Sequence, residues 1–460
     1  MLDPNFIRKN TETIKKIIAA GRSNPEKANI DRWIELDSKR SELISQRDEK
    51  REIRNELSKG LKGKPDPEII EKVRQIKAEL EPIEEELKQI ETEWQAILDW
   101  IPNMPVSEEA MPFGTGEEHN LIDKVWVVGK GYVYEKSENN NTITAGSFNI
   151  KMLPERSPHW DEALEKPVHH LELGTELGII DQEQSAKVSG SRFTYLIGDA
   201  VLLQYALQQM MYEELLKRGF TPIIPPLLVK DRALYGTSHF PEGRDQVYAI
   251  KGDYVEEGTE LNLVGSSEPA NFSLFMDKTL EEESLPRKVF AYTPCFRSEV
   301  GSWGKDVRGI KRLHQFDKIE MNVVCTPEQS KDIFNELLEI NEWVWQQLEI
   351  SYRLARKCTG DAGYHASAEQ VDSEVWLPGQ KELIEVGTDT NTTDFQARRL
   401  NIKYQTKNGE KNLCHTVNDT GIAMGRTLIA IIDNYQQSDG SIKIPKVLQK
   451  YMGKEFIRKQ

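Results

Sequence analysis

The chain has 460 residues and a formal net charge of −15, with 38% apolar and 29% charged residues. This length is too great for a single hydrophobic core, so two or more domains are expected, and the high charge favours a long exposed helical element. No stretch approaches the roughly 18 apolar residues of a membrane span, and the start, MLDPNFIRKN, lacks an apolar signal core, so export is not expected.

A helical hairpin is predicted within the first hundred residues. Apolar side chains in 69–97 recur at alternating spacings of four and three, which is the heptad seam of a coiled coil. A second seam runs through 30–59, and KGLKGKPDP joins the two segments with Gly and Pro residues that break helices. The two helices must therefore lie antiparallel, each roughly 45 Å long. Pro82 lies inside the second helix and is expected to bend it.

Two interpretations of this hairpin are compatible with the sequence. It is either an oligomerisation device or an arm that contacts a partner. The second reading rests on basic residues that suit a phosphate backbone, although glutamates are interleaved with them. These basic residues are Arg40, Arg47, Arg51 and Arg54 on the first helix and Lys59, Lys62 and Lys64 at its end and in the connection.

Beyond the hairpin the pattern becomes mixed. Residues 101–120 are rich in Pro and Gly and are interpreted as a linker. Residues 199–219 have helical periodicity and end at Gly219, which suits a helix C-terminus. The segment FTPIIPPLLV that follows is a short strand whose prolines confine it to a sheet edge or an irregular crossing.

The stretch FRSEVGSWGKDVRGIKRLHQFDKIE (296–320) concentrates six cationic side chains and four carboxylates in an acidic chain. A solvated hairpin loop is the simple interpretation. The flanking segments KVFAYTPCFRSE and FDKIEMNVVC are predicted strands, so Arg297 and Glu320 can both point inward. Arg308 or Arg312 can then fold over a ligand held between these two side chains. Phe316 offers a flat face on which a base can stack.

These parts suit a nucleoside triphosphate, because arginine binds phosphate, a ring stacks on a base and carboxylates hold a metal. Near the end, CHTVNDTGIAMGRTLIAIIDNYQ (414–436) is read as a strand, a Gly-containing turn and a helix, whose N-terminus attracts anions. There is no Walker-type loop or Rossmann fingerprint, so a hairpin-based ATP site is expected. The four cysteines form no Cys-x-x-Cys pair, which disfavours zinc and fits a reducing cytoplasm.

Five strings in order make the chain resemble the bacterial-type seryl-tRNA synthetases, which are class II aminoacyl-tRNA synthetases. The strand around Pro225 resembles motif 1, FRSE and HQF within 296–320 resemble motif 2, and GIAMGRTLIAIIDNYQ resembles motif 3. DFQARRL and YTPCFRSE are further family strings. The resemblance covers essentially the whole chain.

The resemblance implies an α+β fold, with a six-to-seven-stranded antiparallel sheet flanked by helices and preceded by the coiled-coil arm. It implies a tRNA-binding domain at 1–110, with the arm at about 29–100, and a catalytic domain at 111–460. The implied enzyme is a cytoplasmic homodimer that activates L-serine with ATP and Mg²⁺, without zinc. It transfers serine to tRNA(Ser), which the arm binds. The sequence does not decide whether tRNA(Sec) is also charged.

Seven residues are assigned by this resemblance to ATP and its metal: Arg297, Glu299, Arg312, Phe316, Glu385, Thr388 and Arg426. Arg297 is expected to bridge the α-phosphate and the serine carboxylate, and Arg312 to hold the outer phosphates. Phe316 is expected to stack on adenine, with Arg426 on its other face and near the γ-phosphate, while Glu299 faces the adenine side. Glu385 is expected to bind Mg²⁺ with help from Thr388. Arg297, Glu385 and Arg426 are the expected catalytic residues.

Six residues are assigned to serine: Ser266, Glu268, Arg297, Glu320, Asn418 and Thr420. Glu320 is expected to bind the amino or hydroxyl group of serine, and Asn418 and Thr420 to complete the pocket. The chain departs from the family pattern at several of these places. Ser266-Ser267-Glu268 replaces Thr-x-Glu, Gly387 replaces a serine, Asp419 replaces a glycine, and Trp303 fills a position that is usually small.

Two other functions are weighed against this one. A synthetase-like ligase could load a small amino acid onto a carrier protein, but such homologues lack the long arm. The third function, an interaction protein without catalytic activity, is disfavoured. Such a protein would be expected to have lost some of the residues assigned to catalysis and binding, but all five of the following are present: Arg297, Arg312, Glu320, Glu385 and Arg426. Amino-acid-dependent pyrophosphate exchange, with and without tRNA, discriminates among the three.

Overall fold

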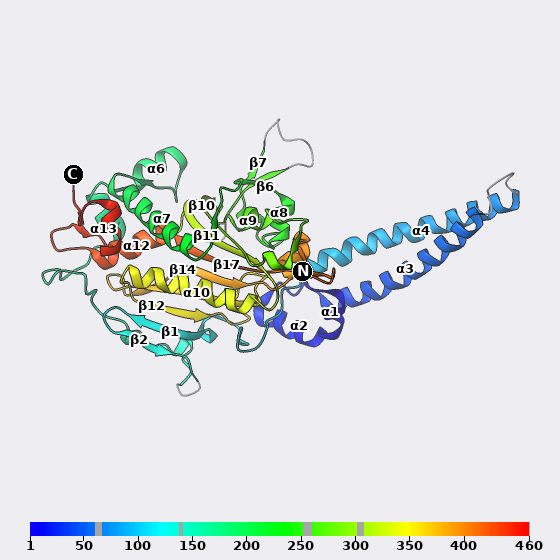
Figure 1. The fold of residues 1–460 in the computed structure, drawn as a ribbon, viewed down its shortest axis with the longest axis horizontal. Helices are drawn as coiled ribbons and strands as arrows, with labels where there is room; N and C mark the ends of the chain where they lie inside the picture. Colours follow the sequence, from blue (N-terminus) through cyan, green and yellow to red (C-terminus); the bar gives the residue numbers. More distant parts are fainter. Residues whose placement is uncertain (60–66, 138–140, 252–259, 301–307, 460) are drawn as a thin grey trace. The chain divides into compact units, whose positions relative to one another are not determined.

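The computed structural model describes residues 1–59, 67–137, 141–251, 260–300 and 308–459 (Figure 1). Trp303 and most of the predicted connection between the arm helices, with Lys62 and Lys64, lie outside these ranges. The chain divides into two compact units, Met1–Pro102 and Asn103–Gln460. Among the described residues, no helix is both long enough and apolar enough to cross a membrane.

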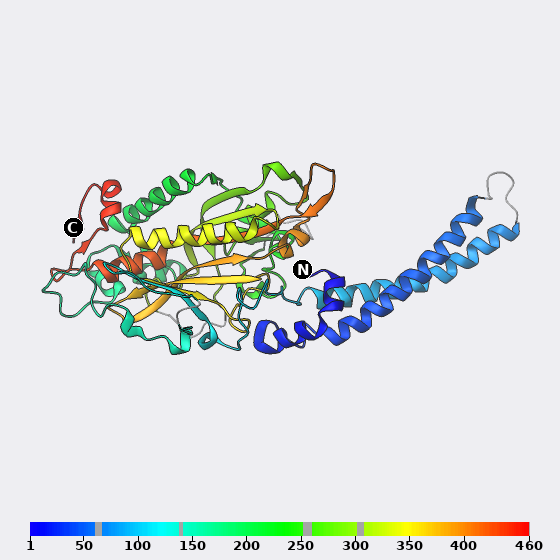
Figure 2. The same cartoon turned by 60° about the horizontal axis from the view of Figure 1, so that its bottom comes forward.

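The first unit confirms the predicted helical hairpin. Short helices α1 (Pro4–Lys9) and α2 (Thr11–Ile17) precede the two long helices α3 (Ile30–Lys59) and α4 (Pro67–Leu98), which lie side by side (Figure 2). Arg32 near the start of α3 pairs with Glu93 near the end of α4, and Lys50 pairs with Glu79 further along. Only antiparallel helices allow both pairs. α4 continues as one helix through Pro82.

The predicted heptad seam of α4 is half-buried to fully buried along its length. Leu80, Leu87, Ile90 and Trp94 of α4 are buried, and the rings of Trp94 and Trp33 on α3 lie 5.5 Å apart. Asp37, itself buried, accepts hydrogen bonds from the Trp94 indole (3.2 Å) and the Arg8 guanidinium (2.6 Å). A buried carboxylate with these partners ties α1 to the base of the hairpin.

Most of the basic side chains on α3 are engaged within the arm. Arg40 pairs with Glu91, Arg51 with Glu84 and Arg47 with Asp48. Such exposed pairs each contribute about 0–1 kcal/mol, so a phosphate can displace the carboxylate partner at small cost.

The second unit is built on a nine-stranded sheet in the order β2-β1-β12-β13-β14-β17-β11-β10-β5. All neighbours are antiparallel except β10 and β5, which are parallel. The strands span Gly131–Glu135, Leu121–Val127, Tyr352–Arg356, Glu369–Leu377, Glu382–Asn391, His415–Ala423, Gln315–Cys325, Arg287–Phe296 and Thr221–Pro222, in that spatial order. The expectation of six or seven strands is exceeded because the hairpin β1–β2 extends one edge and the two-residue β5 the other.

Alternation along β11 separates the core from the pocket. Ile319, Met321 and Val323 are fully buried in the main hydrophobic core. Helices α7 (Asp199–Lys217), α10 (Ser330–Gln347) and α12 (Met424–Tyr435) contribute to the same core. Successive strand residues point to opposite faces, so Lys318, Glu320 and Asn322 lie on the other face of the sheet.

Several local predictions are confirmed, and two are corrected. α7 ends before Gly219, which has φ +80°, and the proline-bearing Thr221–Pro222 is an edge strand. β17 runs directly into α12 without the predicted turn, because Gly421 lies inside the strand. The predicted linker is also partly wrong: Asn103 is buried, and its amide donates to the carbonyls of Ala366 and Thr392 at 2.8 Å.

Candidate active site

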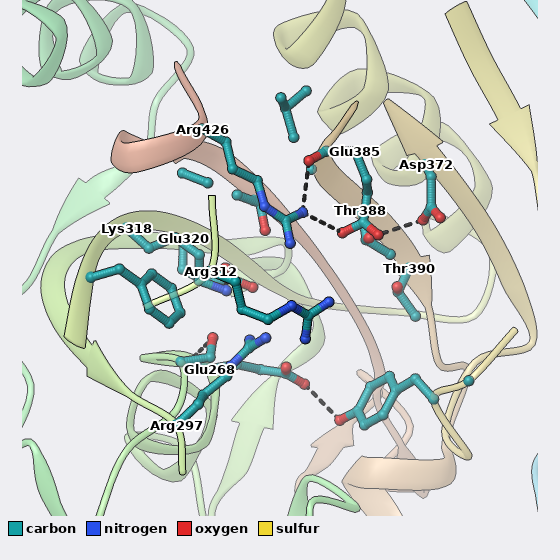
Figure 3. A pocket seen from close by; sticks show the side chains of 18 of the residues that line it. Glu268, Arg297, Arg312, Lys318, Glu320, Asp372, Glu385, Thr388, Thr390 and Arg426 are labelled. Carbon is teal, nitrogen blue, oxygen red and sulfur yellow. Dashed lines mark hydrogen bonds and ion pairs between the residues drawn. The ribbon is translucent and has the colours of Figure 1, made fainter. Parts of the chain in front are cut away.

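All of the residues assigned from the sequence line one pocket of about 580 Å³ on the sheet. They come from the start of α9 (Glu268–Ser273) and the residues before it, from the connection between β10 and β11, and from β11, β14, β17 and α12. The set comprises Ser266, Glu268, Arg297, Glu299, Arg312, Phe316, Glu320, Glu385, Thr388, Asn418, Thr420 and Arg426. Residues more than 150 positions apart in the chain therefore face a shared space (Figure 3).

The outer part of the pocket carries the arginines. Arg297 directly follows β10, and its Nε donates to the carbonyl of Gly265 at 3.1 Å. Its guanidinium lies 5.3 Å from the centre of the Phe316 ring. Arg312 pairs with Glu299 at 2.8 Å. Arg308 instead forms an ion pair with Glu172 and is not among the pocket residues.

A second group of polar side chains lies on β13, β14 and α12. Arg426 Nη1 donates to the carboxylate of Glu385 at 3.0 Å and to its backbone carbonyl at 2.6 Å (Figure 3). The Thr388 hydroxyl donates to Asp372 at 2.9 Å, and Lys357 lies 3.1 Å from the same carboxylate. Burial and the nearby charge of Glu385 raise the pKa of Asp372 to about 7. Lys357 and the Thr388 hydroxyl oppose this shift.

The inner end holds two buried carboxylates. Glu268 accepts hydrogen bonds from Gln396 (2.7 Å) and from the Tyr364 hydroxyl (2.9 Å). Glu320 pairs with Lys318 at 2.5 Å and accepts from the amide of Asn418 at 3.2 Å. Burial raises the pKa of both glutamates, and these partners oppose the shift. The inner end is thus a polar recess with fixed donors and acceptors, suited to a small polar ligand.

Several pocket residues were missed from the sequence. Lys318 could have been found, because it lies two positions before Glu320 on a strand and must share its face. Tyr364, Lys357 and Asp372 gave no such signal, since their neighbours in the chain have no distinctive spacing. The place of Asp372 in the pocket depends on the pairing of β13 with β14, which sets it opposite Thr388. Lys357 follows β12, and its backbone N–H donates to the carbonyl of Gln370 on β13.

No cluster of three or more His, Cys, Asp or Glu side chains able to hold a metal occurs among the described residues. The four cysteines are free and buried. Glu385, Thr388 and Asp372 offer oxygen ligands from two adjacent strands, and Mg²⁺ is commonly held by one or two carboxylates together with substrate phosphates. The residues therefore fit a Mg²⁺ that arrives with a nucleotide.

The antiparallel sheet and the polar pocket on it define the class of protein. Residues 248–435 match the profile of the tRNA synthetase class II core domain (G, H, P, S and T). A prolyl-tRNA synthetase from Giardia lamblia shares the fold over 61% of this chain and 55% of its own, with a TM-score of 0.53 and 16% identity. The second unit is thus a class II tRNA synthetase core.

The particular family follows from the whole chain. Residues 1–105 match the seryl-tRNA synthetase N-terminal domain. Proteins named serine–tRNA ligase from Rubrobacter xylanophilus (36% identical, 99% of each chain) and Petrotoga mobilis (37% identical, 99% of this chain and 100% of theirs) align nearly end to end. The seryl-tRNA synthetase of Pyrococcus horikoshii, complexed with ATP, matches with a TM-score of 0.84, 32% identity and full coverage of both chains. This chain belongs to the seryl-tRNA synthetase family.

Proposed function

We propose that this protein activates L-serine with ATP to seryl-adenylate and transfers the seryl group to the 3′ end of tRNA(Ser). The observation that carries the proposal is one pocket with arginines toward its outer part and two buried carboxylates at its inner end. Family membership supports the same reaction.

Activation needs an attack by the serine carboxylate on the α-phosphate of ATP, with pyrophosphate leaving. We assign Arg297 to the α-phosphate and the serine carboxylate, where negative charge grows during attack, and Arg312 and Arg426 to the outer phosphates. Arg312 and Arg426 are paired with Glu299 and Glu385, and phosphate would compete with these carboxylates for the two arginines. Such phosphoryl chemistry depends on positioning and charge neutralisation more than on proton transfer.

Adenine is assigned to the space beside the Phe316 ring, and Glu299 is assigned to the edge of the adenine. Serine is assigned to the inner end, where Glu320 receives its amino or hydroxyl group and Asn418, Thr420 and the Ser266–Glu268 segment complete the recess. Lys318 holds one oxygen of Glu320. The other oxygen is bonded to Asn418, so the carboxylate has a defined orientation before serine arrives.

This recess predicts strong discrimination between serine and alanine. Alanine would leave the buried hydrogen-bonding groups around Glu320 without the hydroxyl, and such sites can reject the analogue by about 10⁴ or more. Pyrophosphate exchange measured over serine, threonine, alanine and glycine tests the prediction. Comparable kcat/KM values for serine and alanine would overturn the serine assignment.

Mg²⁺ bound at Glu385 and Thr388 would neutralise phosphate charge during activation. Glu385→Gln keeps the shape but removes the negative charge of this ligand, so we expect the Mg²⁺ concentration for half-maximal exchange to rise about tenfold or more. The measurement is an exchange titration with Mg²⁺ at saturating serine. Glu382→Gln, a carboxylate on the same strand that does not line the pocket, is the control. An unchanged Mg²⁺ requirement in Glu385→Gln would refute the ligand assignment.

We further propose that the arm binds tRNA, that two copies form a dimer, and that the enzyme is cytoplasmic. The catalytic unit exposes large apolar side chains on and around α7 and β5: Ile197, Leu202, Tyr205, Leu216 and Ile224. Apolar surface of this kind supports a contact between two copies. A sedimentation experiment that found only monomers would exclude the dimer.

The four free, buried thiols support a reducing compartment.

A further inference from the structure

β17 is irregular at the position where it carries Thr420 into the pocket. Its ladder with β14 ends at Asp389↔Asp419. On its other side, Glu320 pairs with Thr420 while Ile319 pairs with Ile422, so Gly421 is an extra residue, as in a β-bulge. A bulge re-aims the side chains beside it, and here those side chains include Thr420.

A side chain from α10 reaches this irregularity from the core face of the sheet. Asn341, 2% exposed, donates from Nδ2 to the carbonyl of Thr420 at 2.9 Å and to the carboxylate of Asp419 at 3.1 Å. Its Oδ1 accepts from the Trp345 indole at 3.0 Å. Because an indole only donates, Oδ1 must face Trp345 and the amide NH₂ must face β17. Each of its hydrogen-bonding groups has a partner.

The space for this amide exists because residue 387 on β14 is glycine. A Cβ built on Gly387 would lie 2.9 Å from Nδ2 of Asn341 and 3.1 Å from the carbonyl oxygen of Thr420. The amide cannot easily swing aside, since three hydrogen bonds hold it. Gly387 and Asn341 therefore share one site: a larger side chain at 387 would occupy the place of the amide.

We propose that Asn341 is a positioning residue for amino-acid recognition, which acts by fixing the β17 bulge so that Thr420 faces the serine recess. Gly387 leaves the space that the Asn341 amide occupies. The inference rests on the proposed function, because it gives Thr420 a role toward serine. Asn341 does not itself touch the substrate, since it approaches from α10 on the opposite face of the sheet from the pocket.

The first test is Asn341→Ala. Leaving the buried Thr420 carbonyl without this donor is expected to raise the KM for serine about tenfold or more, with the KM for ATP changed less than about twofold. Asn434→Ala is the matched control, because the Asn434 amide also donates two buried hydrogen bonds to backbone carbonyls, those of Trp376 and Ala430. Asn434 does not line the pocket, so its variant is expected to lose stability without a serine-selective KM change.

The second test is rescue. Gly387→Ser alone is expected to resemble Asn341→Ala, because its Cβ displaces the amide. In the variant that combines Asn341→Ala with Gly387→Ser, the space of the amide is free. The introduced side-chain hydroxyl at position 387 can then donate to the Thr420 carbonyl. The KM for the substrate serine is therefore expected to fall by threefold or more relative to either single variant. If Asn341→Ala does not fold, Gly387→Ala takes its place. Serine and ATP KM values that change together, or no rescue, would overturn the proposal.

Hydrogen exchange separates this inference from the proposed function. Backbone amides at 419–423 are expected to exchange faster in Asn341→Ala than in the parent, with no substrate present. Unchanged exchange there would refute the positioning role whatever amino acid the enzyme takes. A parent that shows no serine-dependent pyrophosphate exchange would instead refute the proposed function.

Discussion

Arg297→Ala is expected to abolish detectable adenylate formation while leaving the fold intact. The guanidinium is assigned to the place where negative charge builds on the α-phosphate and the attacking carboxylate. Removing one preorganised donor of this kind typically costs 10²–10³ in rate, and Arg297 is assigned to two such groups, so a loss of about 10³ or more is expected. Arg297 is exposed, and its guanidinium donates a hydrogen bond to the Gly265 carbonyl at the surface, so truncation leaves no cavity in the core.

The measurement is serine-dependent pyrophosphate exchange at saturating ATP and serine, with thermal unfolding as the check on fold. Arg232→Ala is the matched control, because Arg232 is an exposed arginine paired with Asp277 and does not line the pocket. It is expected to keep the parent's rate. Exchange by Arg297→Ala at near the parent's rate would remove the central residue from the mechanism.

Shortening the arm is expected to cripple tRNA charging while serine activation continues. Replacing 48–82 by a short Gly-Ser turn removes the distal helices but keeps Leu43, Leu87 and the Trp33–Trp94 contact that close the base of the hairpin. Every residue assigned to ATP and serine belongs to the second unit, so the small-molecule pocket is expected to survive. Charging is expected to fall about 10²-fold or more, because the phosphate contacts proposed for the arm disappear.

Pyrophosphate exchange and tRNA charging are measured on the same shortened protein. Fewer phosphate contacts release fewer counterions, so the salt dependence of tRNA binding should also become shallower. Arg54→Gln with Lys59→Gln in the full-length arm separates charge from length: a partial loss of charging is expected. Charging at the parent's level by the shortened protein would favour the alternative reading of the arm as an oligomerisation device.

Local patterns were sufficient to predict the arm and the strands around the basic loop. The seam through 69–97 depends only on side chains three and four positions apart, and α4 runs from Pro67 to Leu98. The strands β10 and β11 likewise follow from their own residues and from the polar loop between them. The residues that line the pocket were named through motif resemblance, and the structure brings them together.

The sequence by itself determined the two arm helices, the helix that ends before Gly219, the strands on both sides of the basic loop and the face of β11 that carries Glu320. These properties depend on neighbours within a few positions. Only the tertiary structure decided what lies opposite those faces. Lys357 and Asp372 meet through strand pairing, Gln396 and Tyr364 meet at Glu268, and Asn341 reaches β17 through the space beside Gly387. Such contacts depend on sheet register and close packing between distant segments, since a shift of one residue would turn every side chain of a strand to its other face.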